Sequence, residues 1–98
     1  MQAPLWIIHR SADISWRDWD GLGAVYNDAS GDTHLVDALS IEFLELLRGQ
    51  PLSVAQLVEQ LADAIPDQMD VETATAFFDR QLRSLRDLGL VEQIVAPA

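Results

Sequence analysis

The sequence predicts a single α+β domain over residues 1–98, with a three-stranded antiparallel sheet and three helices. Ile14–Trp19 alternates apolar and polar residues, which is the period of a half-buried strand, and Gly23–Asn27 and Asp32–Val36 are short runs that include β-branched and aromatic residues. After residue 36, three segments carry apolar residues at helical spacing, and turn residues separate these segments. Hydrophobic residues make up 49% of the chain, which is enough for one core without disulfide bonds.

The predicted sheet consists of consecutive strands at Ile14–Trp19, Leu22–Asn27 and Thr33–Val36. Short connections favour an antiparallel meander for such strands. The segment Asp28-Ala29-Ser30-Gly31 has the chemistry of a turn, because glycine accepts a positive φ and aspartate and serine side chains bond nearby backbone groups. Both outer strands keep a free backbone edge unless another part of the fold covers it.

Capping signals delimit the first two helices. Asp37 is placed as the N-cap of the first helix, and Gly49 is placed as the C′ residue that ends it. The second helix begins at Ser53, which forms a capping-box pattern with Gln56. Pro66 ends that second helix.

The third helix is the longest and is followed by a strand. Asp70 is its expected N-cap, the helix runs from about Val71 to Leu88, and Gly89 is its expected C′ residue. Leu90–Val95 then reads as a strand that pairs with Leu5–Ile8. Two helices, a long third helix and a strand beside a small sheet form the layout of a winged helix-turn-helix domain.

Charge and composition exclude several classes of function. Sixteen acidic residues against six basic ones give a net charge of −10, so we expect neither a nucleic acid nor an anionic membrane as partner. The basic residues are all arginine, and Arg80, Arg83 and Arg86 lie in the third helix, where pairing with Asp79 or Asp87 is the simplest role. The absence of cysteine, of a signal peptide and of an apolar run near ~20 residues favours a cytoplasmic protein.

No arrangement of residues in the sequence favours catalysis, a metal or another cofactor. His9 and His34 are the only histidines, which leaves too few ligands for a histidine-rich metal site. His34 alternates with Leu35 in its strand and is expected to be structural or exposed rather than a catalytic base. Gly21 and Gly23 read as turn glycines, and no phosphate-binding loop is present. We therefore expect a protein that is not an enzyme.

Four segments resemble a known family. VYNDASGDTHLVD, IEFLELLRG, LSVAQLVEQLA and LRDLGLVE resemble segments of the PqqD-like peptide chaperones, also called RiPP recognition elements. The SGDTHL variant is similar to the PqqD-family proteins of HPr-rel-A gene clusters, which also contain an HPr-kinase-like protein. The resemblance covers roughly Ile14 to Glu92.

The resemblance implies a function as well as a fold. It implies a domain without enzymatic activity that binds the leader part of a precursor peptide and presents it to a modifying enzyme encoded nearby, in an HPr-kinase-like system. The leader would add as a strand beside Asp32–Val36 and rest against the helix from about Val71 to Leu88.

The residues themselves favour the same surface. An open strand edge offers backbone groups for strand addition, and a helix beside it forms a second wall. An arginine at the border of that wall favours an acidic peptide segment. Phe77 is also a candidate for the core, beside Phe78. The predicted peptide-binding residues are Asp32, Thr33, His34, Leu35 and Val36 on the strand, and Phe77, Arg80, Gln81, Ser84 and Leu88 on the helix.

Two alternatives remain open at the level of sequence. A winged-helix transcriptional regulator would expose all three arginines of the third helix together with a basic wing, whereas the turn here carries Asp28 and Asp32. A protein–protein interaction module is the other alternative. The free strand edge would also allow two copies to pair, so a homodimer is a further expectation.

Overall fold

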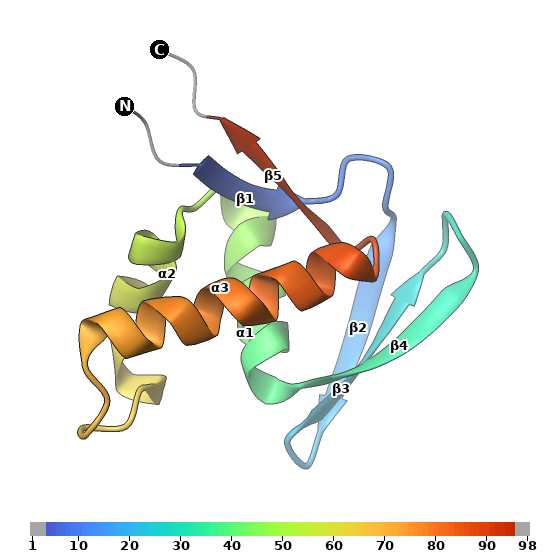
Figure 1. Ribbon diagram of the computed structural model, residues 1–98. Coiled ribbons are helices and arrows are strands. Elements are labelled where there is room, and N and C mark those ends of the chain that lie inside the picture. Colours follow the sequence, from blue (N-terminus) through green and yellow to red (C-terminus); the bar gives the residue numbers. More distant parts are fainter. Residues whose placement is uncertain (1–3, 96–98) are drawn as a thin grey trace.

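The computed structural model describes residues 4–95, apart from the side chain of Trp19, and these residues form an α+β fold. Three α-helices and one short 3-10 helix accompany five strands in this part of the chain (Figure 1). In order, the elements are β1 (Pro4–Ile8), β2 (Ile14–Trp19), β3 (Leu22–Asn27), β4 (Asp32–Asp37), α1 (Ala38–Gly49), α2 (Val54–Gln60), η1 (Ala62–Ala64), α3 (Val71–Asp87) and β5 (Val91–Val95).

The strands form two separate antiparallel sheets. The first has the order β2-β3-β4, with Val25 opposite Trp16 on one side and opposite His34 on the other. The second pairs β1 with β5, which confirms the predicted pairing of the two ends of the chain. Trp6 of β1 also exchanges backbone hydrogen bonds with Leu52, so β1 is held on both sides.

The core lies where α1 and α3 pack together. Figure 1 shows α3 crossing α1, with the three-stranded sheet on one side and α2 on the other. Phe43 of α1 meets Phe78 of α3 edge to face, with ring centroids 5.0 Å apart. Such a pair adds about 0.5–1.5 kcal/mol beyond the burial of the rings. Trp6 of β1 is fully buried in the same core.

The predicted caps explain most helix boundaries. The side chains of Asp37, Ser53 and Asp70 accept hydrogen bonds from the first turns of α1, α2 and α3, and the capping box of Ser53 with Gln56 is complete. Gly89 follows α3 with a φ of 79°, and the amide of Leu90 donates to the carbonyl of Leu85. This is the Schellman arrangement expected of a glycine at C′.

The predicted ends of the first two helices are wrong. Gly49 belongs to α1, and Gln50 is the C-cap with extended backbone. Residue 50 precedes Pro51, and a residue before proline is disfavoured in helical conformation, so the proline rather than the glycine determines where α1 ends. The second helix ends at Gln60, before the predicted end at Pro66, and the short 3-10 helix η1 follows it.

Two assignments in the sheet also change. Gly21 does lie in the β2–β3 turn with a φ of 79°, but Gly23 lies inside β3, where an added Cβ would collide with the side chain of Ile41. In the β3–β4 turn, Ser30 Oγ accepts from the amide of Asp32, as predicted, but Oδ1 of Asn27 rather than the side chain of Asp28 accepts from the amides of Ala29 and Asp13.

Within residues 4–95, no helix has both the length and the apolar character needed to cross a membrane.

Gly23→Ala should lower the free energy of unfolding by about 1–3 kcal/mol, because the added methyl group enters packed space between β3 and α1. Gly49→Ala is the matched control, since open space surrounds that glycine in α1. It should raise stability by up to about 1 kcal/mol. Urea denaturation of both variants measures the difference, and equal effects of the two substitutions would contradict the packing argument.

The Arg10–Glu92 pair should make stability depend on pH. Arg10 donates from Nη2 and from its backbone amide to the Glu92 carboxylate, at 2.9 and 2.7 Å, and these hydrogen bonds lower the pKa of Glu92. A lowered folded-state pKa stabilises the protein above the ordinary pKa of the carboxyl group, and this stability is lost as pH falls through the folded-state pKa.

The stability difference between wild type and Glu92→Gln should therefore be largest near neutral pH and shrink in acid. Arg10→Ala should reduce the same pH dependence without abolishing it, because the variant loses the guanidinium but keeps the backbone amide of residue 10. Denaturation curves between neutral and strongly acidic pH measure both variants, and an unchanged profile in Arg10→Ala would overturn the assignment.

Candidate functional site

The predicted binding strand lies at an open edge of its sheet. β4 pairs with β3 on one side, and within the described residues no other strand pairs with its outer side. Alternate amides and carbonyls of an edge strand in an antiparallel sheet point away from the neighbouring strand. β4 therefore presents unpaired backbone groups along Asp32–Asp37, one residue beyond the predicted strand at each end.

The side chains of β4 divide between two faces. His34 and Val36 lie on the inner face with Val25, where Val36 is buried and His34 is half-buried. Thr33 and Leu35 lie on the outer face, where Leu35 is 70% exposed. This division agrees with the alternation expected for His34 and makes the outer face of the edge partly apolar.

One side-chain hydrogen bond joins α3 to the C-terminal end of β4. Gln81 Nε2 donates to Asp37 Oδ2 at 2.9 Å, which connects the middle of α3 to the end of β4. At the start of β4, Ala29 and Ser30 of the turn line a small cavity together with Gly89. Gln81 thus connects the middle of α3 to the end of β4, and both elements are on the near side of the molecule in Figure 1.

The predicted helix residues form one strip on the side of α3 toward β4. Phe77, Gln81, Ser84 and Leu88 follow each other at intervals of three or four residues, which places them on one face. This face borders the buried positions of α3, and Gln81 directs it toward Asp37. We call these four residues the α3 strip.

Exposure varies along the α3 strip. Phe77 is half-buried against the core, and its ring lies 6.3 Å from that of Phe78. Gln81 is half-buried, Ser84 is exposed and Leu88 is 40% exposed. The C-terminal part of the strip is thus more accessible than Phe77, whose side chain is shared with the core.

The three arginines of α3 have different surroundings. Arg83 forms a 2.7 Å ion pair with Asp79 one turn away, as predicted, and Arg86 lies 3.8 Å from its sequence neighbour Asp87. Arg80 is exposed and has no ion-pair partner among the described residues. It precedes Gln81 and lies one turn from both Phe77 and Ser84, so it borders the α3 strip on the solvent side.

Asp37, predicted from the sequence only as a helix cap, also belongs to the site. Its Oδ1 accepts from the amide of Ser40 at 2.9 Å while its Oδ2 accepts from Gln81. The cap was visible in the sequence, but a contact across 44 positions between two polar residues leaves no periodic signal.

His34 has an unusual environment for a polar side chain. Its Nε2 is buried and has no hydrogen-bond partner in the described part of the chain. An unpaired buried group of this kind costs about 1–3 kcal/mol. No group of three or more potential metal ligands gathers around it or elsewhere among the described residues.

Comparison of the chain with protein-family models, with curated proteins and with solved structures finds no match. What the site binds must therefore follow from its own geometry and chemistry.

Asp37→Ala should destabilise the protein by about 1 kcal/mol, because it removes both the helix cap and the bond to Gln81. Asp37→Ser should restore most of this loss, since serine retains the cap but does not reach Gln81. Gln81→Ala should cost less than about 1 kcal/mol because the bond is exposed. Denaturation of the single and double variants measures the coupling, and zero coupling would show that the bond does not hold α3 to β4.

Proposed function

We propose that this chain is a peptide-binding domain without catalytic activity, which binds the leader of a precursor peptide as an added strand along β4. The observation that carries the proposal is the open edge of β4 beside the α3 strip. Backbone hydrogen bonds along such an edge provide affinity for an extended chain. The resemblance of the sequence to the PqqD-like chaperones, and with it the likeness to a winged helix-turn-helix domain, supports the same proposal.

Side chains around the edge would provide selectivity. Leu88 offers an apolar contact to a bound peptide, whereas Ser84 and Gln81 offer polar ones. Arg80 offers a charge that is not used by an ion pair among the described residues. A leader with an acidic residue opposite Arg80 would therefore gain a charge-assisted hydrogen bond.

The proposed role is to hold the leader for a separate modifying enzyme of the same gene cluster. The described residues show no cluster of nucleophile and base at the edge of β4, and the only histidine of the strand has its Nε2 buried. A domain of this kind acts by concentrating and orienting a peptide for another protein.

Peptide binding should protect every second amide of β4 from hydrogen exchange, because only alternate amides face the open edge. The probes are synthetic peptides that cover the short open reading frames beside the gene, titrated into the isotope-labelled chain. We expect amide shifts in Asp32–Asp37 and from Gln81 to Leu88. Shifts confined to other parts of the chain, or shifts only with duplex DNA, would overturn the proposal.

Matched substitutions on α3 separate an effect on peptide binding from an effect on folding. Ser84→Trp places a large ring on the α3 strip, and Ala76→Trp places the same ring at an exposed position away from it. The first should weaken binding by about tenfold or more, which is about 1.4 kcal/mol, and the second should not. Arg80→Ala should weaken binding of acidic peptides, with Arg86→Ala as its control.

A further inference from the structure

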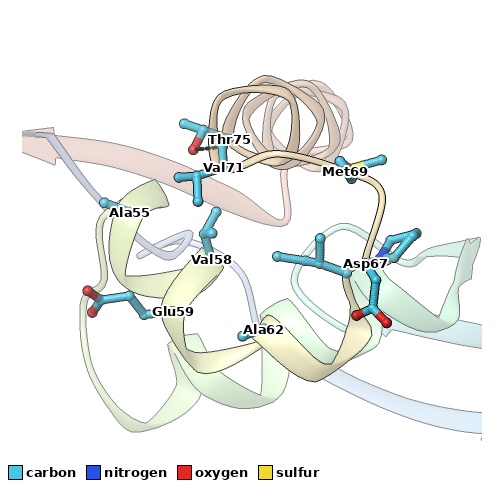
Figure 2. Close-up of a pocket in the computed structure, with 10 residues that line it drawn as sticks. Ala55, Val58, Glu59, Ala62, Asp67, Met69, Val71 and Thr75 are labelled. Carbon is cyan, nitrogen blue, oxygen red and sulfur yellow. Dashed lines mark hydrogen bonds between the residues drawn. The ribbon is translucent and has the colours of Figure 1, made fainter.

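A second concave surface lies at the opposite end of α3 from the part that faces β4. It is a cavity of about 530 Å³ between α2, η1 and the first turn of α3. Val58 of α2 and Val71 of α3 point toward each other across it, and Ala62 and Met69 lie further along its lining (Figure 2). Its volume falls within the range of ligand and docking pockets in proteins.

The lining of this cavity is apolar and incompletely covered by the chain. Val71 is 73% exposed, whereas Met69 and Ile65, which line the same cavity, are half-buried. Covering this exposed valine side chain would remove apolar surface from water. A partner that covers Val71 and enters the cavity would therefore gain from the hydrophobic effect.

The inside of the cavity offers little polar recognition. Thr75 Oγ1 donates to the carbonyl of Val71 at 2.7 Å, so the hydroxyl donor is used within α3, as Figure 2 shows. Small-molecule sites place a few converging polar groups inside an apolar pocket. The charged residues of the lining are Glu59 and Asp67, and both are exposed to solvent.

The charge around the cavity has one sign. Residues 49–72 contain no arginine, lysine or histidine. The acidic residues of this segment are all exposed, and they are Glu59, Asp63, Asp67, Asp70 and Glu72. An apolar cavity whose charged lining residues, Glu59 and Asp67, are both carboxylates is complementary to an apolar side chain with basic neighbours.

We propose that this surface, which we call the α2–α3 cavity, docks a basic amphipathic helix of a partner protein. Apolar side chains of that helix would enter between Val58 and Val71, and its lysine or arginine residues would face Glu59 and Asp67. Helix-in-groove docking fits this place because the surface is built from helices and has no strand edge to extend. The docking surface is separate from β4, so a bound peptide and this partner do not compete.

The first probe is a pair of synthetic 15-residue helical peptides, one of leucine and lysine and one of leucine and glutamate, titrated into the full chain. The lysine peptide should bind and shift amides around Ala62 and Val71, whereas the glutamate peptide should not bind. The proposal would be overturned if both peptides bound equally well. It would also be overturned if the lysine peptide shifted only amides of β4.

Variants distinguish docking in the cavity from attraction to a negatively charged protein. Ala62→Trp fills the cavity from an exposed position, and Val71→Asp, also at an exposed position, places a charge at its entrance. Each variant should lower the affinity for the lysine peptide by about tenfold or more. Retained affinity in a folded Val71→Asp variant would overturn the proposal even if Ala62→Trp failed to fold.

Charge reversal supplies a matched control. The double variant Glu59→Lys, Asp67→Lys removes the negative charge of the cavity rim, and Asp18→Lys, Glu45→Lys makes the same change in net charge at exposed positions on β2 and α1. The rim variant should lose about tenfold or more in affinity and the control much less. Equal losses would show that only net charge is recognised. Leader binding is measured at β4, so failure of the leader experiment and failure of the lysine-peptide experiment can be told apart.

Discussion

The packing of α1 between the three-stranded sheet and α3 determines the arrangement of the other elements. Ile41 occupies the space that Gly23 leaves in β3, and Phe43 packs against Phe78 of α3. Both contacts are buried, so the sheet and α3 cannot approach each other without displacing α1. α1 thereby sets the relative position of the sheet and α3, and the exposed bond between Asp37 and Gln81 joins α3 to the end of β4.

Local signals in the sequence predicted much of this arrangement. The caps at Asp37, Ser53 and Asp70 depend on side chains that reach backbone amides three residues away, so the sequence displays them directly. The α+β class and the pairing of the chain ends also followed from periodicity. The role of Gly23 did not, because its small size is required by Ile41 from a later helix and not by a local turn.

The candidate site divides in the same way. Helical spacing predicted the α3 strip, and alternation placed His34 opposite Leu35. The burial of His34 Nε2 and the contact of Gln81 with Asp37 are tertiary features that no spacing encodes. The α2–α3 cavity was missed for a related reason. Its lining residues follow ordinary helical periods, and the hollow arises only from the break between α2 and η1 and the turn that leads into α3.

The two faces of β4 have a consequence for how a bound peptide would be read. A strand added to this edge would place alternate residues beside His34 and Val36, facing the protein interior, and the others beside Leu35, facing outward. Shifting the peptide by one residue would exchange these two sets of side chains completely. The edge therefore distinguishes alternate residues of a bound peptide. Whether apolar residues of a leader fall on every second position would matter as much as which apolar residues they are.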